Sequence, residues 1–282
     1  MKSILAVVGD GTARPLLETA LLVAKRFSGR IVGLNTLTTE YAVVFGGEMG
    51  FSISSEVDRT LEREGQERRD QARALFHAVM RKHGIQVGGA PGANAVTAEW
   101  REEAGRQNAV VGAIGRVFDL IVVERPAKLA SLAEATLEDA LFEGGRPVLM
   151  APATPLKTFG ENILIAWNNS TETARTVAFA MPFLERARQI EVLSVEGAQV
   201  PGPAGDELAA MLRYHGLAAT AHHVTPKGRT PPGEIFLNEA KRAGADLLVK
   251  GAYTQSRLRQ MIFGGATRHI IMEADIPVIL AH

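Results

Sequence analysis

Short apolar runs alternate with longer amphipathic stretches along the whole chain. The clearest runs are almost continuously apolar: residues 4–8, 120–123, 163–167 and 247–249. Such runs are typical of strands in a parallel sheet whose two faces are both covered by helices. The stretches after the first and third runs place apolar residues three and four positions apart, as in helices packed on one side. The pattern predicts an α/β fold with right-handed crossover connections.

The order of these elements occurs twice along the chain. Residues 3–37 and 162–195 each contain an apolar run, a polar turn, a long amphipathic stretch and a second apolar run. Such self-similarity indicates duplicated domains. A segment containing two prolines and a glycine, residues 151–162, separates the copies and is interpreted as a linker. We expect two tandem domains, 1–153 and 154–282, each an open Rossmann-like parallel sheet of about five strands.

The first copy contains an additional charged stretch, residues 54–84. Apolar residues interrupt the charges at helical period, which predicts a long helix with a solvated face rather than an interaction tail.

Composition narrows the classes of function. Lysine plus arginine and aspartate plus glutamate number 31 each, so no overall field favours nucleic acid or an anionic membrane. Cysteine is absent, which excludes disulfides, thiolate nucleophiles and zinc sites with cysteine ligands. The first apolar run is too short for a secretion signal, and no run of eighteen apolar residues occurs. We therefore expect a cytoplasmic protein with neither nucleic-acid nor membrane partners.

Candidate chemistry lies near the end of the chain, in KGAYTQSRLRQMIFGGATRHII, residues 250–271. Gly251 follows a predicted strand, and Gly264 and Gly265 precede a predicted helix. Ligands of open parallel sheets bind at the carboxyl ends of the strands, and helix N-termini bind phosphate. The spacing alone favours a tight turn followed by a helix cap over a phosphate site, and both alternatives stay open.

This layout, together with ILIAWNNSTETART at the start of the second half, resembles the universal stress protein family in its tandem form. The resemblance covers essentially the whole chain. It implies the adenine-nucleotide alpha hydrolase-like version of the fold, with the two halves packed as a pseudo-dimer whose final strands meet. It also implies an adenine nucleotide, ATP with Mg²⁺, as the ligand of the second half.

Nucleotide-binding members of that family carry Gly, two residues, Gly, nine residues, Gly and then Ser or Thr. On this pattern Gly251 matches the first glycine and Gly264 the third, while Thr267 is a further hydroxyl residue on the opening helical turn. The resemblance implies that backbone N–H groups near Gly264 and Thr267 bind phosphate. A side chain at Gly264 would then block the site, because the missing Cβ admits the phosphate.

Three departures weaken this predicted site. Thr254 stands at the second glycine, Gly265 at the hydroxyl residue, and Asn168 at the aspartate that ends the first strand. Threonine enters positive-φ conformations at a higher cost than glycine, and asparagine lacks the charge that binds Mg²⁺ or a ribose hydroxyl firmly. Arg257 and Arg259, between the glycines, are either additional phosphate ligands or exposed surface residues.

The first half departs further from the pattern. Glu124 replaces the first glycine, and several acidic residues follow it. Asp10 stands one position after the family's aspartate. Because negative charges repel phosphate, we expect no nucleotide in this half.

Other chemistry finds less support in the sequence. The motifs of P-loop proteins, nucleophile-elbow hydrolases, dinucleotide-binding folds and HExxH metalloproteases are absent. His222 and His223 are adjacent, so on a strand they point to opposite faces and cannot share one metal ion. His269 is interpreted as a half-exposed helix residue. Trp167 and Tyr253 either stack on a base or cover the core.

Three functions remain open from the sequence. The first is a nucleotide-responsive stress protein, and the second is an interaction or scaffold protein with both sites degenerate. A slow ATPase ranks last, since no general base or metal-binding carboxylate stands at Asn168. Expected partners are an adenine nucleotide and the protein itself, as an intramolecular pseudo-dimer or a homodimer.

Overall fold

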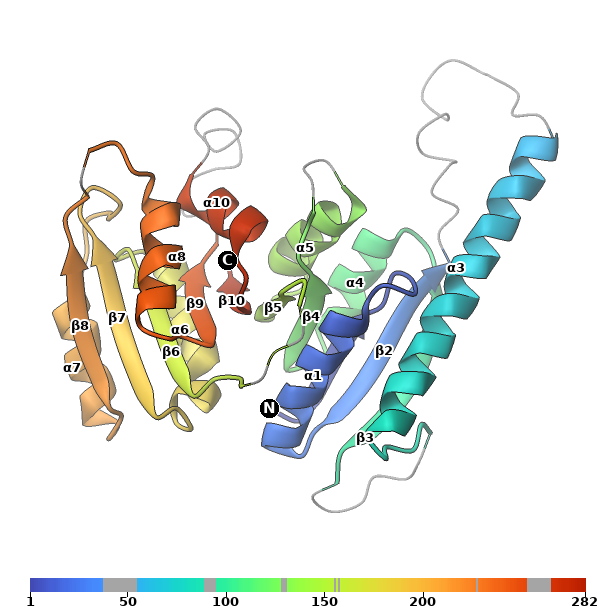
Figure 1. The fold of residues 1–282 in the computed structure, drawn as a ribbon, viewed down its shortest axis with the longest axis horizontal. Helices are drawn as coiled ribbons and strands as arrows, with labels where there is room; N and C mark the ends of the chain where they lie inside the picture. Colours follow the sequence, from blue (N-terminus) through green and yellow to red (C-terminus); the bar gives the residue numbers. More distant parts are fainter. Residues whose placement is uncertain are drawn as a thin grey trace.

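In the computed structural model, the described residues are 1–37, 55–88, 95–127, 131–154, 156, 158–226, 228–252 and 265–282. The first half contains five strands and four helices within these residues (Figure 1): β1 (Ser3–Val7), α1 (Arg14–Phe27), β2 (Arg30–Leu37), α3 (Ser55–Lys82), β3 (Thr97–Ala104), α4 (Gln107–Gly115), β4 (Leu120–Glu124), α5 (Leu132–Glu143) and β5 (Val148–Ala151). The second half repeats the alternation: β6 (Asn162–Trp167), α6 (Thr171–Leu184), β7 (Gln189–Val195), α7 (Gly205–Tyr214), β8 (Ala219–Val224), α8 (Pro232–Arg242), β9 (Leu247–Gly251), α10 (Ala266–Glu273) and β10 (Val278–Ala281).

The ten strands form one sheet in the order β3-β2-β1-β4-β5-β10-β9-β6-β7-β8. Pairing within each half is parallel, whereas β5 and β10 pair antiparallel, with Val148 opposite Leu280 and Met150 opposite Val278. The predicted α/β fold and the predicted meeting of the final strands are therefore confirmed. The antiparallel join covers a backbone edge that each half would otherwise expose.

Each half contains one point where strand order reverses. In the first half β1 lies between β2 and β4, and in the second half β6 lies between β7 and β9. Loops leave the two central strands in opposite directions at such a point, which creates a crevice outside the carboxyl ends. The two crevices, at β1/β4 and at β6/β9, are the positions at which this fold presents a ligand site.

Local signals explain where the helices begin. Ser131 accepts a hydrogen bond from the backbone N–H of Glu134 at the start of α5, and Ser170 accepts one from Thr173 at the start of α6, each at 3.2 Å. Both are serine caps that satisfy an N–H group left free by the helix.

The predicted charged helix is present as α3, which extends over 28 residues. Within the described part of the chain, no helix is long and apolar enough to cross a membrane.

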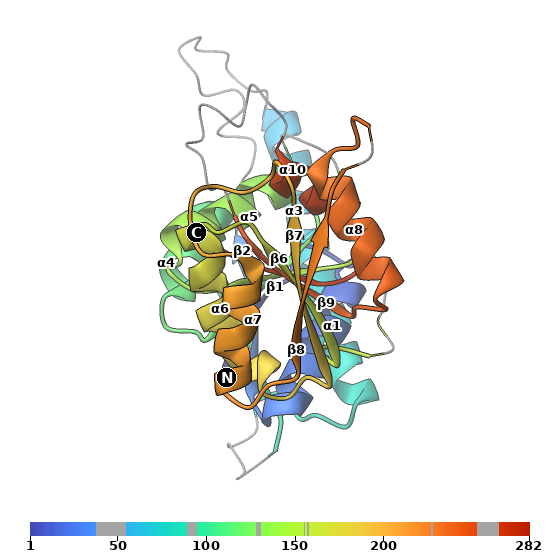
Figure 2. The same cartoon turned by 90° about the vertical axis from the view of Figure 1, so that its left-hand side faces the viewer.

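Helices cover both faces of the sheet (Figure 2). One buried apolar layer packs α1, α3, α6 and α7 against the sheet, and the other packs α4, α5, α8 and α10. Both layers contain residues of both halves, so the core continues across the β5/β10 join. This arrangement explains the continuous apolar runs of the sequence, since strand residues of either parity are buried.

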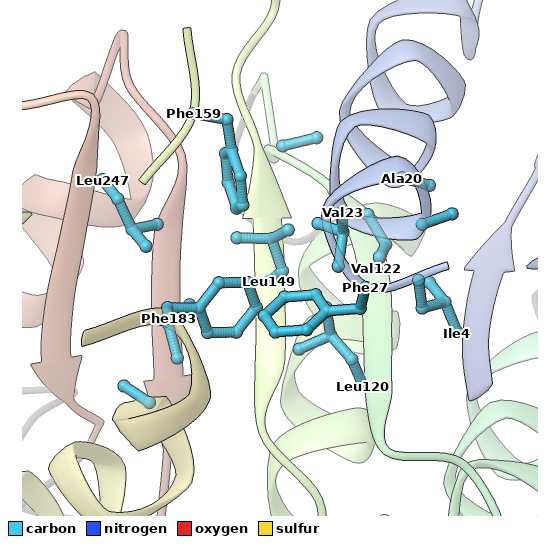
Figure 3. Packing of buried hydrophobic residues seen from close by; sticks show 14 of the residues in the cluster. Ile4, Ala20, Val23, Phe27, Leu120, Val122, Leu149, Phe159, Phe183 and Leu247 are labelled. Carbon is cyan, nitrogen blue, oxygen red and sulfur yellow. The ribbon is translucent and has the colours of Figure 1, made fainter. Parts of the chain in front are cut away.

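Aromatic side chains fill the junction between the halves (Figure 3). The ring of Phe27 from α1 meets that of Phe183 from α6 edge-on, with centroids 5.1 Å apart, and Phe159 packs on Phe183 at 5.7 Å. The guanidinium of Arg186 lies 4.5 Å from the centre of the Phe27 ring, and Arg26 donates to the carbonyl of Gly160 at 3.0 Å. The halves therefore share buried packing as well as backbone pairing, as a pseudo-dimer does.

Candidate functional site

Two of the predicted residues, Asn168 and Gly251, both lie against Thr173 of α6 at the β6/β9 crevice. Asn168 directly follows β6 and is buried; its Oδ1 accepts hydrogen bonds from Ser170 Oγ at 2.8 Å and Thr173 Oγ1 at 2.5 Å, with the Ser170 N–H at 3.4 Å. These contacts tie the strand end to the first turn of α6. The oxygen is therefore occupied by the chain's own donors, and Asn168 does not supply an open ligand for Mg²⁺.

Gly251 ends β9 against the same helix. A Cβ placed on Gly251 would lie 2.4 Å from the backbone nitrogen of Thr173 and 2.8 Å from the carbonyl carbon of Glu172. Real side chains do not tolerate such distances to backbone atoms. Close packing of β9 against α6 thus accounts for a glycine at this position, independently of any phosphate.

The N-terminus of α10 presents a different surface. Gly265 caps the helix with extended backbone and is exposed, and a Cβ added to it would meet no atom of the described residues within 4 Å. Thr267, on the first turn, is buried. Four more predicted positions, Thr254, Gly264, Arg257 and Arg259, lie outside the described residues, as does Tyr253. Among the described positions, Gly265 is therefore the one where an approaching group would meet free N–H groups in open space.

A buried lysine, which the sequence analysis did not identify, lies beside this crevice. Lys250 is 3% exposed, and its Nζ donates to the carbonyl oxygen of Gly251 at 3.1 Å. Burial lowers the pKa of Lys250 to about 8, against the opposing effect of the Glu172 carboxylate. The available signal was a single lysine inside the otherwise apolar strand LLVKG.

The β1/β4 crevice of the first half is a pocket of about 270 Å³. It is lined by Val7, Gly9, Asp10, Asn35, Thr36, Gly65, Arg68, Arg69, Gln107, Val123, Glu124, Ser131, Leu132, Ala133 and Thr136. The structure thus brings Asp10 and Glu124 together at the strand ends. Burial, and secondly the negative charge of Asp10, raises the pKa of Glu124 to about 7.

This raised pKa makes folding stability depend on pH. The folded state holds the Glu124 proton more tightly than the unfolded state does, so the free energy of unfolding should fall as pH rises from about 4.5 to about 7 and then level off. Glu124→Gln removes the ionisable group, and we expect this variant to be more stable than the wild type at pH 8 by about 3 kcal/mol. The two proteins should be nearly equal at pH 4.5.

Denaturant unfolding at the two pH values measures this effect. Glu99→Gln on β3 is the matched control, because Glu99 is an exposed carboxylate paired with Arg30. It should change stability by less than about 0.5 kcal/mol at either pH. An equal stability of wild type and Glu124→Gln at pH 8 would show that the Glu124 carboxylate is not desolvated.

The histidines behave largely as expected. His223 contacts Asp206 at 2.6 Å, whereas His222 lies 3.7 Å from Glu239, so the two neighbours do point to different partners. His222 also forms a group with Glu191 and Glu239, whose ligand atoms all lie within 4.8 Å of one another. Arg242 binds both of these carboxylates, at 2.9 Å for Glu191, and so already offsets part of their negative charge.

Trp167 and His269 both lie against neighbouring helices. The indole N–H of Trp167 donates to the carbonyl of Pro203 at 2.9 Å, and the buried side chain lines an apolar pocket of about 450 Å³ between α6 and α7. His269 lies on the face of α10 that packs against α8, because a Cβ on Gly233 would come within 2.7 Å of the His269 Cβ.

Comparison with known proteins finds similarity to proteins of stress responses. Residues 160–282 match the model of the universal stress protein family. A segment of 49 residues, 17% of this chain, is 37% identical to "Stress response protein NhaX" of Bacillus subtilis (strain 168), and the match spans 30% of that relative's length.

Two solved structures have the same fold. A universal stress protein from Archaeoglobus fulgidus DSM 4304 superposes with a TM-score of 0.66 at 13% identity, over 99% of this chain and 95% of that one. The functionally unknown protein PA1789 from Pseudomonas aeruginosa PAO1 gives a TM-score of 0.55 at 16% identity, over 100% and 92%. Both likenesses extend over the two halves, so they support the two-half architecture as a whole.

Proposed function

Residues 160–282 belong to the universal stress protein family, and from this premise we propose that the protein serves a stress response by binding an adenine nucleotide, ATP with Mg²⁺, in its second half. The resemblance of the segment 250–271 to the family's nucleotide motif supports the ligand class. We further propose that the nucleotide acts by modulating association with a partner or with a second copy.

One observation carries this proposal. The exposed cap of α10, at Gly265, lies in the loop connection that follows β9 at a point of strand-order reversal. Unpaired N–H groups and the positive end of the helix dipole favour a phosphate there. Asn168 offers no open metal ligand, so Mg²⁺ would reach the site bound to the phosphates. With no carboxylate at Asn168, we do not propose hydrolysis.

A second candidate function is an interaction protein that binds no nucleotide. The contacts of Asn168 and Gly251 favour it, since both residues are explained by packing at the start of α6. In this second function, the continuous core and the β5/β10 join hold the two halves in a fixed arrangement, and partners bind to the surface that the joined halves present.

Two substitutions at Gly265 that differ from each other only in charge separate the two candidate functions. The position has room for a side chain, and both aspartate and asparagine are good helix caps. Gly265→Asp should weaken ATP binding at least about tenfold, or about 1.4 kcal/mol, because a carboxylate would repel the phosphates. Gly265→Asn, which has the same size and caps the helix in the same way, should bind ATP at least about tenfold more tightly than Gly265→Asp, because it carries no charge. Calorimetric titration with ATP and Mg²⁺ measures both.

Two results would contradict nucleotide binding at this site. Equal affinities of the aspartate and asparagine variants would place the phosphates elsewhere. Absence of binding by the wild type at millimolar ATP, with no nucleotide in mass spectra of the freshly purified protein, would favour the interaction protein.

A further inference from the structure

The pocket at the β1/β4 crevice has two walls of different chemistry. The strand-end wall consists of Asp10, which follows β1, Asn35, which lies near the end of β2, and Glu124, which ends β4. The α3 wall consists of Arg68 and Arg69, both half-buried. Acceptors thus line one side and guanidinium donors the other.

Asn35 indicates that the strand-end wall lacks a donor. The residue is 3% exposed, and its Nδ2 donates to the carbonyl of Val8 at 2.6 Å and to that of Gly9 at 3.4 Å. These two bonds fix the amide orientation, and the buried Oδ1 has no partner among the described residues. Leaving a buried acceptor without a donor destabilises the folded chain, and a donor bound in the pocket would remove that cost.

The charges of the two walls suit a ligand that carries both signs. Two carboxylates and a carbonyl oxygen favour an ammonium group at the strand ends, and they oppose a phosphate there. Arg68 and Arg69 favour a carboxylate at the opposite side. The volume of 270 Å³ equals about nine water molecules, which is room for a small organic molecule rather than for a bare metal ion alone.

We propose that this pocket binds a small zwitterion of the amino acid class, with its ammonium group on the strand-end wall and its carboxylate on the α3 wall. The site lies in the first half and is separate from the proposed nucleotide site. The tandem protein then carries two ligand sites of different specificity at equivalent positions of its two halves.

Protonation of Glu124 couples this binding to pH. Among the residues that the structure describes, the other charged side chains lining the pocket are Asp10, from the loop after β1, and Arg68 and Arg69 from α3. The ammonium group is held best by the ionised Glu124, whose pKa in the free protein is raised to about 7. Affinity should therefore increase by about tenfold between pH 6 and pH 8.

Matched probes test the two ends of the ligand. Glycine, 4-aminobutyrate and 6-aminohexanoate present both charges at increasing separation, n-butylamine presents only the ammonium group, and butyrate only the carboxylate. In calorimetry and thermal-shift titrations at pH 8, at least one zwitterion should bind with a millimolar Kd. Butylamine and butyrate should each bind at least about tenfold more weakly, the equivalent of about 1.4 kcal/mol.

Variants assign the binding to the pocket. Asp10→Asn removes the charge and keeps the oxygen that accepts from Thr12 at 2.7 Å, so the fold should persist. Asp10→Asn and Glu124→Gln should each weaken zwitterion binding at least about tenfold. Glu99→Gln, outside the pocket, should leave it unchanged, and ATP should neither compete with the zwitterion nor enhance its binding.

Several outcomes would overturn the proposal. One is that no zwitterion binds at tens of millimolar, and another is that butylamine or butyrate binds as tightly as the zwitterions. A thermal shift with Mg²⁺ alone larger than the shift with any zwitterion would also contradict it. So would an unchanged zwitterion affinity in both Asp10→Asn and Glu124→Gln.

Discussion

Residues 1–153, expressed without the second half, are expected to unfold at a lower temperature than the intact chain and to self-associate. In the full chain β5 pairs with β10, and all four residues of β5 are buried. The fragment would expose this backbone edge together with Phe27, whose ring loses Phe183. An open edge beside an exposed apolar patch favours association with another copy.

Size-exclusion chromatography with light scattering and thermal unfolding measure this expectation. The control is co-expression of residues 1–153 with residues 154–282, which should restore a one-to-one complex, because the second fragment supplies β10 and Phe183. A monomeric first fragment as heat-stable as the intact chain would show that the junction contributes little to stability.

The sheet could be predicted from sequence because its signals are local. Continuous apolar runs at residues 4–8 and 163–167 correspond to β1 and β6, and the repeated order of runs indicated two copies of one topology. The join of β5 and β10 is a contact between strands distant in sequence, and it was predicted from the family resemblance rather than from the pattern.

The candidate site was less accessible to sequence reasoning, because its residues acquire their roles from neighbours distant in sequence. Gly251 and Asn168 matched or replaced motif positions, yet their contacts show that both also fix the start of α6. Lys250 and Asn35 were not identified, since the burial that makes them unusual depends on the surrounding sheet. The pairing of Asp10 with Glu124 likewise requires the parallel alignment of β1 and β4.

Gly251→Ala is expected to destabilise the protein by about 2–3 kcal/mol, the usual cost of overpacking a tight contact. The new methyl group would lie 2.4 Å from the Thr173 nitrogen and 2.6 Å from its Oγ1. The nitrogen is part of the backbone at the start of α6, so relief requires either that helix or the end of β9 to move. Denaturant unfolding should show an earlier midpoint with little change in slope.

The same substitution at Gly65 provides a control of opposite sign. Gly65 lies within α3, and its Cβ would approach only the flexible end of the Arg69 side chain, at 3.5 Å. Alanine is favoured over glycine inside a helix by about 0.8–1 kcal/mol, so Gly65→Ala should stabilise the chain. A Gly251→Ala variant as stable as the wild type would contradict close packing of β9 against α6. If the loss is observed, reduced nucleotide binding in any Gly251 variant would not implicate this glycine in phosphate recognition, which is why the charge-only pair at Gly265 is the cleaner probe.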